Sequence, residues 1–287
     1  MAVLVCMGGW LAGAAEPEAA PPETLRVLAY NIWEGGTANA QPLSRTLAVL
    51  ETAQADILLL QEVDASLEAL AAATGFHAHR INNSCVVMSR WPLGETGRYG
   101  TEVVLPGGEV LWAASIHLEA YPYGPYDLRN YPSLTSEALI ATARETRERP
   151  LQRVLDEMAV RAADKTMIVG GDFNEPSHLD WTAAAAAAGQ NFARVVAWPT
   201  SRQTLRAGLE DAYRAVHPDP VKHEGRTWTP IESEGEVHDR IDRVYWRGSG
   251  WAPVQAEILG PEDAHTTLPV TPFPSDHRAV LITFARR

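Results

Sequence analysis

Acidic, amide and imidazole side chains recur where apolar, strand-like segments of this sequence end. The side chains that follow this pattern are Asn31, Glu62, His117, Asp172, Asn174, Asp242, Asp276 and His277. Strand ends are rigid mounting points, and the loops there can hold side chains around one cleft. The pattern therefore predicts a single polar site that is assembled from distant segments of the chain.

Several carboxylates in one cleft would repel one another unless protons or a cation intervened. Hard oxygen ligands together with an amide favour Mg²⁺, with Mn²⁺ or Ca²⁺ as alternatives. Zinc is less favoured, because the sequence has neither a thiolate cluster nor an HExxH motif. The residue types thus indicate a divalent cation that is bound through oxygen atoms.

The segments that must position these side chains show strand and helix patterns in alternation. Strands are expected over residues 25–33, 57–63, 85–88, 111–118, 167–169, 241–246 and 279–284, and helices over 42–54, 67–73, 133–163 with a break at Pro150, 183–188 and 211–216. The Pro/Tyr-rich residues 119–132 are expected to form a loop. Short turns between several neighbours favour an α/β sandwich with mixed sheets, in one domain over residues 24–287.

The N-terminal residues have the features of an export signal. Residues 2–15 form an apolar run too short to span a bilayer easily, and Ala12-Gly13-Ala14 supplies a cleavage pattern of small residues. We therefore expect a signal peptide over residues 1–15, a polar spacer over 16–23 and an exported protein, periplasmic or extracellular. No Lys or Arg precedes the apolar run, which departs from the usual signal.

The charge of the chain limits its partners. The formal net charge is −12, from 24 Lys and Arg against 36 Asp and Glu. Proteins that grip duplex nucleic acid usually present a basic face to the phosphates, and no cluster of Lys and Arg is visible here. Tight, processive DNA binding is therefore disfavoured. A distributive hydrolase is less affected, because a bound cation can supply positive charge locally.

The polar segments form an ordered set of short motifs. They are YNIW (30–33), LQEV (60–63), SIHLEA (115–120), GGDFNEP (170–176), RIDRVYW (240–246) and SDHRAV (275–280). Their order and gaps resemble those of the endonuclease/exonuclease/phosphatase superfamily, which includes DNase I, apurinic endonucleases, neutral sphingomyelinases and inositol polyphosphate 5-phosphatases. The likeness extends over roughly residues 24–287, and GGDFN with SDH is its most specific part. It implies a four-layered α-β-β-α sandwich with two mixed β-sheets and a metal-dependent phosphoric ester hydrolase.

The resemblance also implies which residues hold the cation. Glu62 would be the principal metal ligand. Asn31 would lie beside it, either as a ligand or as a hydrogen-bond donor to the ligand. Asp276 would help to hold the metal, directly or through water.

The remaining motif residues would then be catalytic. Asp172 would orient or deprotonate the attacking water, and Asn174 would hydrogen-bond the phosphoryl oxygens. His277 would lie over the scissile phosphate, paired to Asp242, which fixes its tautomer and stabilises its cationic form. His117 would donate to a phosphate oxygen or to the leaving group. The division of acid and base roles between the two histidines stays open.

Other polar residues near the motifs compete for the site. Asp239 and Asp242 lie three positions apart on a strand and would point to opposite faces, so only one can face the cleft. Asp242 matches the family position, and His238 and Asp239 are expected at the rim or surface. Asp180 is expected in a turn and Trp181 in the core, with a place in the lining of the site as the alternative.

The substrate is less well specified by the sequence. Histidine at position 117 resembles DNase I, the sphingomyelinases and the inositol phosphatases, whereas apurinic endonucleases tend to have tyrosine there. The loop after it contains Tyr121, Tyr123, Tyr126, Tyr131 and Arg129. These side chains could stack on a ring and clamp a second phosphate, or they could simply hold down a Pro-rich loop.

The leading hypothesis is a hydrolase that acts on a small phosphate ester of a sugar, polyol, nucleotide or lipid headgroup. The first alternative is a secreted nonspecific nuclease, with nucleic acid as substrate despite the lack of a basic binding face. The second is a binding module that kept the fold without catalysis. We expect no stable membrane insertion and take a monomer as the default state.

Overall fold

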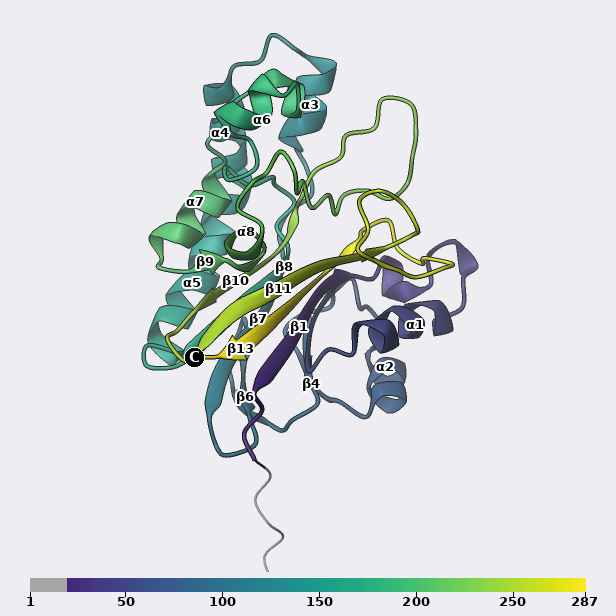
Figure 1. Cartoon of the computed structure of the whole chain (residues 1–287), viewed down its shortest axis with the longest axis vertical. Coiled ribbons are helices and arrows are strands. Elements are labelled where there is room, and N and C mark those ends of the chain that lie inside the picture. The colour runs from purple at the N-terminus through teal and green to yellow at the C-terminus, as the bar shows by residue number, and fades with distance from the viewer. Residues whose placement is uncertain (1–19) are drawn as a thin grey trace, which may run out of the picture.

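The computed structural model describes residues 20–287 (Figure 1). The predicted signal peptide and the first part of the predicted spacer, together residues 1–19, lie outside the described residues. Within residues 20–287, no helix combines the length and the apolar character that crossing a membrane requires.

One sheet has the strand order β12-β11-β13-β1-β2-β4-β3. Its strands are β1 (Thr24–Asn31), β2 (Ile57–Gln61), β3 (His77–Arg80), β4 (Val86–Ser89), β11 (Trp251–Gly260), β12 (Leu268–Pro269) and β13 (Ala279–Arg286). Strand β1 pairs in parallel with β2 and antiparallel with β13. The sheet is therefore mixed, as the short connections predict.

The second sheet has the order β5-β6-β7-β8-β10-β9. Its strands are β5 (Leu93–Thr96), β6 (Thr101–Val104), β7 (Val110–His117), β8 (Thr166–Asp172), β9 (Glu210–Asp211) and β10 (Asp242–Arg247). Strand β8 pairs in parallel with β7 and antiparallel with β10. This sheet is also mixed, and three of its central strands end in residues of the predicted site.

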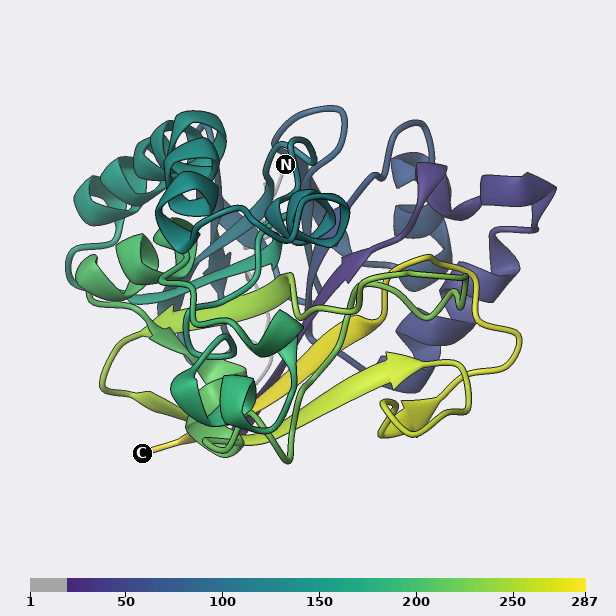
Figure 2. The ribbon, with the colours of Figure 1, turned by 90° about the horizontal axis from the view of Figure 1, so that it is seen from above.

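Helices cover the outer face of each sheet, and others lie at the edges and beyond the ends of the strands (Figures 1 and 2). They are α1 (Ser44–Ala53), α2 (Leu67–Thr74), α3 (Gly124–Asn130), α4 (Ser136–Ala143), α5 (Arg149–Arg161), α6 (Ala183–Ala187), α7 (Pro199–Arg206) and α8 (Ala212–Val216). Helices α1 and α2 share an apolar cluster with the first sheet, and α5 shares another with the second. A third cluster lies between the two sheets. These four layers confirm the predicted α-β-β-α sandwich.

The apolar strands are buried on both faces. In β1, Leu25, Val27 and Ala29 point into the core between the sheets, whereas Leu28 and Tyr30 point toward the layer of α1 and α2. Successive side chains of a strand alternate between its faces, so a strand between two layers must be apolar throughout. Most polar residues of these strands therefore lie near the strand ends.

Two expectations about the second half of the sandwich are wrong. Residues 119–132 are not all loop, because they contain α3, with a proline in its first turn. Pro125 fits there, since the first turn of a helix has unpaired N–H groups in any case. Pro150 does not break the long helix either: a π-helical turn over Arg144–Glu148 precedes α5 and accommodates the missing N–H.

A buried ion network fixes the segment that leads into β10. Arg240 Nη2 lies 3.0 Å from Asp180 Oδ1 and 2.8 Å from Asp211 Oδ2, and Arg214 Nε lies 2.6 Å from Asp180 Oδ1. Burial opposes ionisation of Asp180, but the guanidinium groups of Arg240 and Arg214 outweigh it and lower the Asp180 pKa. Asp180 lies in a turn, as expected, and its carboxylate is also a buried anchor.

The network predicts an acid-sensitive contribution to stability. A carboxyl with a lowered pKa stabilises the fold while ionised, and this contribution is lost as pH falls through that pKa. Asp180→Asn should lower the free energy of unfolding at pH 7 by about 3 kcal/mol, because it removes the carboxylate that two buried guanidinium groups share. Urea unfolding at pH 7 and at about pH 3.5 should show a smaller pH effect in the variant. Glu95→Gln, which removes an exposed pair with Arg161, should change stability by less than about 1 kcal/mol.

Gly171 lies in β8 at a position where the neighbouring strands leave no room for a side chain. Its φ is 138°, and a Cβ there would lie 2.1 Å from the Ile116 carbonyl oxygen and 2.7 Å from Gln61 Nε2. We expect Gly171→Ala to lower the free energy of unfolding by about 3 kcal/mol or more. Gly189→Ala is the control, since Gly189 also has positive φ but no atom within 4 Å of the added Cβ. Equal melting temperatures for the two variants would contradict this account.

Candidate active site

The register of the second sheet places three predicted site residues in one row. His117 at the end of β7 is opposite Asp172 at the end of β8, and Asp172 is opposite Asp242 at the start of β10. Residues directly opposite each other on neighbouring strands share a face of the sheet. Strand pairing alone therefore brings one imidazole and two carboxylates together.

The first sheet contributes an amide and a carboxylate from its own strand ends. Asn31 ends β1, and Glu62 follows β2 with a φ of 56°. The Asn31 amide Nδ2 donates to Glu62 Oε1 at 3.0 Å and to Asp172 Oδ2 at 3.2 Å. The Glu34 N–H donates to Glu62 Oε2 at 2.9 Å. Asn31 thus connects the polar ends of the two sheets.

The segment with Asp276 and His277 is held by a serine that the sequence did not single out. Ser275 Oγ donates to the Asn31 carbonyl oxygen at 2.7 Å and accepts from the His277 N–H at 3.0 Å. Both bonds are buried. The position of Ser275 directly before Asp276 and His277 was the available signal, but a serine before an acid is too common to stand out.

His277 is a buried cation. Its Nδ1 donates to Asp242 Oδ2 at 2.9 Å, and its Nε2 lies 3.6 Å from Asp172 Oδ2. Burial disfavours the charged ring, but the Asp242 and Asp172 carboxylates outweigh that effect and raise the His277 pKa to about 10. The ring therefore holds a proton at neutral pH and directs one N–H toward Asp172.

Asp172 lies between the two histidines. Its Oδ1 accepts from the Asn174 N–H at 2.8 Å, and its Oδ2 lies 3.6 Å from His117 Nε2. Burial raises the Asp172 pKa, the His277 charge lowers it and the Asp242 carboxylate raises it again. The net direction is upward, which suits a carboxylate that accepts a proton.

Hydrogen bonds also hold the side chains of His117 and Asn174 in place. Ser84 Oγ lies 2.8 Å from His117 Nδ1 and accepts from the Glu62 N–H at 3.0 Å. Asn174 has a φ of 47°, and its Nδ2 donates to the Leu118 carbonyl oxygen at 2.9 Å. Ser84 is a second supporting residue that sequence reasoning missed, since it lies in a turn without a motif of its own.

Two sets of acidic residues could hold a divalent cation. Ligand atoms of Asp172, Asp242 and His277 lie within 4.8 Å of one another in the described part of the chain. His277 is protonated there and already donates a hydrogen bond to Asp242. Its positive charge would repel a cation, so we consider this set a poor binding site. We therefore favour the neighbouring set of Glu62 and Asp276.

Glu62 and Asp276 fit a hard cation. Asp276 Oδ1 is buried without a hydrogen-bond partner. Burial raises the Asp276 pKa to about 6, with the Glu62 charge adding to the rise against the opposing charge of His277. An ion between these carboxylates would satisfy the unpartnered oxygen and offset their repulsion. Asn31 Oδ1 accepts from the Trp33 N–H at 3.1 Å, so its amide orients Glu62 in this arrangement.

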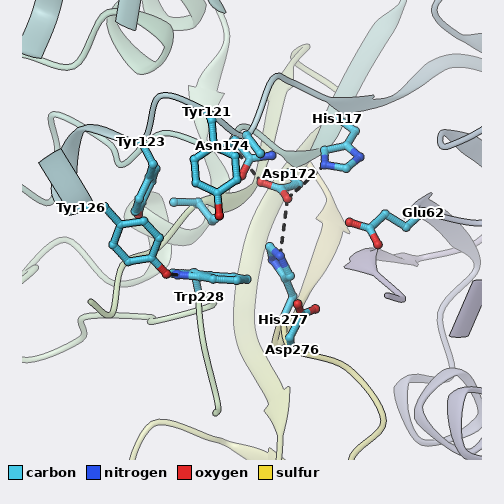
Figure 3. A pocket seen from close by; sticks show the side chains of 12 residues that line it. Glu62, His117, Tyr121, Tyr123, Tyr126, Asp172, Asn174, Trp228, Asp276 and His277 are labelled. Carbon is cyan, nitrogen blue, oxygen red and sulfur yellow. Dashed lines mark hydrogen bonds and ion pairs between the residues drawn. The ribbon is translucent and has the colours of Figure 1, made fainter. Parts of the chain in front are cut away.

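Most of the predicted site residues border one hollow of about 130 Å³. Figure 3 shows Glu62, His117 and Asp276 at one side, His277 and Asp172 in the middle, and a wall of aromatic rings at the other. The lining residues are Glu62, His117, Ala120, Tyr121, Tyr123, Tyr126, Asp172, Asn174, Trp228, Ile241, Asp276 and His277. Asn31 and Asp242 lie behind this surface and contact residues that reach it.

The competing residues near β10 are placed differently from expectation. Asp242, not Asp239, contacts His277. Asp239 is not at the surface, however: it is buried and accepts from the Tyr123 hydroxyl at 2.7 Å and from Trp181 Nε1 at 3.0 Å. The carboxylate can be buried because residues distant in sequence donate hydrogen bonds to it. No local sequence pattern reveals these donors. Trp181 is in the core, as expected.

The aromatic loop contributes only in part. Tyr121, Tyr123 and Tyr126 line the hollow, but Tyr131 does not and is 65% exposed. Arg129 donates to the Gly235 carbonyl oxygen at 2.9 Å and does not line the hollow. Trp228 completes the wall, although no motif in the sequence analysis included it.

Comparison with known proteins agrees with this architecture. A Caenorhabditis elegans protein of uncharacterized function is 25% identical over 289 residues, which cover 91% of each chain. Humanized D. rerio TDP2 has a TM-score of 0.59 at 18% identity, covering 92% of this chain and 99% of that one. The complex of D. rerio TDP2 with single strand DNA product gives 0.58 at 17%, with the same coverage. The human Nocturnin catalytic domain with bound sulfate anion gives 0.56 at 18%, covering 92% and 95%.

At these identities, the structural likenesses establish a shared fold and nothing finer. The sequence match is more direct: the model of the Endonuclease/Exonuclease/phosphatase family matches residues 28–277, which span every residue of the site described above. Together with the two mixed sheets and the row of polar strand ends, it shows that this chain belongs to the Endonuclease/Exonuclease/phosphatase family.

Proposed function

We propose that this chain hydrolyses a phosphodiester or phosphomonoester of a small polar substrate by attack of an activated water. The observation that carries the proposal is the meeting of Asp172, His117 and the His277 imidazolium at one hollow of about 130 Å³. A hollow of this size admits a small ester, whereas a polymer would need a long groove.

Asp172 is suited to activate the water. Its Oδ1 is fixed by the Asn174 N–H, which leaves Oδ2 toward the histidines. A buried carboxylate with a raised pKa is a stronger base than one in water, so it can take a proton as the water attacks phosphorus.

The two histidines and Asn174 are suited to the charge that develops on the phosphoryl group. The protonated His277 donates an N–H into the hollow and is held by Asp242. Preorganised donors in a site that excludes water stabilise such charge effectively. His117 lies on the other side of Asp172, where it can donate to a phosphate oxygen or to the leaving group.

A divalent cation would complete the site. Glu62 and Asp276 would hold it, and Mg²⁺ suits their oxygen atoms best, with Mn²⁺ or Ca²⁺ as alternatives. When bound, such a cation supplies Lewis-acid polarisation of the phosphoryl oxygens. The role of Asn31 is to orient the Glu62 carboxylate toward it.

A nuclease is the second candidate function. D. rerio TDP2, a structural neighbour, has been solved with single strand DNA product. Against this reading, the net charge is −12, and within residues 20–287 the hollow is lined by no Lys or Arg. Phosphate backbones on either side of the scissile bond would therefore meet few cationic partners.

The two functions are separated by a substrate panel. The protein is incubated with Mg²⁺, Mn²⁺ or Ca²⁺ and, in parallel, with plasmid DNA, RNA, a chromogenic phosphodiester and a chromogenic phosphomonoester. We expect turnover of at least one small ester and little nicking of DNA. Rapid nicking would reverse the ranking, and no reaction with any ester would favour a binding module.

Removing the proposed base or acid should abolish turnover without unfolding the protein. Asp172→Asn and His277→Ala are each expected to reduce kcat by a factor on the order of 10²–10⁴. His77→Ala, which removes an exposed histidine on β3, serves as the control and should retain full activity. Circular dichroism checks the fold, and unchanged kcat in either site variant would refute its assigned role.

Glu62→Gln should weaken binding of the cation without impairing the hydrolysis step itself. Loss of the negative charge is expected to raise the Mg²⁺ concentration at half-maximal activity by about 10- to 100-fold. Saturating Mg²⁺ should restore most of kcat, whereas it should not restore Asp172→Asn. A Glu62→Gln variant with unchanged Mg²⁺ dependence would show that the cation is held elsewhere.

A further inference from the structure

The hollow has an aromatic half that the proposed chemistry does not use. Tyr121, Tyr126 and Trp228 line it on the side away from Glu62 (Figure 3). The Trp228 ring also lies against His277, with 4.8 Å between ring centroids. A ring-sized space thus begins directly beside the imidazolium that faces the phosphoryl position.

Hydrogen bonds hold this wall in place. Trp228 Nε1 donates to the Tyr126 hydroxyl at 3.0 Å, and that hydroxyl donates to Glu236 Oε1 at 2.7 Å. The Trp228 carbonyl oxygen accepts from the Asp239 N–H at 2.7 Å. The two segments that form the wall are therefore tied to each other before any ligand arrives, which reduces the ordering that binding would require.

Tyr121 is the most exposed residue of the aromatic wall. It is 66% exposed, yet its backbone is clamped on both sides: the buried Arg147 donates to the carbonyl oxygens of Ala120 at 2.9 Å and of Pro122 at 2.7 Å. Arg147 comes from the π-helical turn before α5. An aromatic ring whose backbone is anchored but whose faces are left largely uncovered is available to stack on a ligand.

The size and charge of the hollow restrict the ligand. Its volume is about 130 Å³, close to that of an engineered cavity of about 150 Å³ that binds benzene. Its lining contains the carboxyl groups of Glu62, Asp172 and Asp276, and no Lys or Arg among residues 20–287. One ring fits these conditions, whereas a second phosphate would find no Lys or Arg in this lining to pair with.

We propose that Tyr121 and Trp228 form a specificity subsite for one uncharged ring attached to the scissile phosphate, and that this subsite disfavours substrates with a second phosphate. The inference deepens the proposed function and rests on it for the position of the phosphoryl group. It selects ring-bearing esters from the broader class of small phosphate esters.

Phosphonates test the subsite without turnover, because their P–C bond replaces the hydrolysable ester bond. Binding of phenylphosphonate and methylphosphonate is measured by calorimetry with saturating Mg²⁺. Stacking on aromatic side chains is expected to give phenylphosphonate at least a roughly tenfold lower Kd in the wild-type protein. Equal Kd values for the two phosphonates would overturn the proposal.

Variants locate the effect. Tyr121→Ala should remove most of the preference for phenylphosphonate while leaving the Kd of methylphosphonate unchanged. Tyr131→Ala is the matched control, because Tyr131 is 65% exposed and lies outside the hollow. Trp228→Leu provides a second test of the wall and should also reduce the preference. If Tyr131→Ala lost the preference for phenylphosphonate while Tyr121→Ala kept it, the assignment of the ring subsite to Tyr121 would be refuted.

A third ligand tests the charge argument. We expect 1,4-phenylenebisphosphonate to bind more weakly than phenylphosphonate, and tighter binding would overturn the exclusion of a second phosphate. Because these are binding measurements, a protein that prefers the ring but hydrolyses no ester would sink the proposed function and leave the subsite standing. Hydrolysis of small esters without any ring preference would sink the subsite alone.

Discussion

The site depends on one buried amide. Asn31 Nδ2 contacts carboxylates from both sheets, Glu62 at 3.0 Å and Asp172 at 3.2 Å. An amide can donate to two carboxylates at once without adding a charge of its own. It therefore fixes the spacing of the proposed cation site and the proposed base. Ser275 links the main-chain carbonyl of Asn31 to the segment with His277. Loss of this contact would separate the two halves of the site even if both sheets stayed folded.

The surrounding fold makes this concentration of acids tolerable. Asp172 and Asp242 are buried next to each other, and the His277 imidazolium compensates part of their charge. Glu62 and Asn174 adopt positive φ values of 56° and 47°, which non-glycine residues maintain only where their surroundings determine them strongly. The fold thus maintains this arrangement despite charge repulsion and backbone strain. A divalent cation would offset the repulsion between the carboxylates of Glu62 and Asp276.

The proposed ring subsite is built by elements outside the two sheets. The π-helical turn before α5 directs Arg147 inward, where it holds the chain around Tyr121. Helix α3 and the segment after β9 then close the aromatic wall through Tyr126, Trp228 and Glu236. In the proposed arrangement, the sheets hold the reacting groups, whereas the peripheral segments hold the ring subsite. One scaffold can therefore keep the same chemistry while the substrate changes.

The sequence by itself indicated the family, the layered α/β class and most of the polar residues that meet at the hollow, because strands buried on both faces carry most of their polar side chains near their ends. Asn31, Glu62, Asp172 and His277 stand out for that reason. It did not reveal the helical turn around Pro125, the continuity of the helix past Pro150 or the burial of Asp239. Those features depend on hydrogen-bond partners that lie far away in sequence. Only the tertiary structure decided which aromatic rings face the hollow and that Asn31 joins the two sheets, since both follow from how the two sheets and their helices pack and not from local composition.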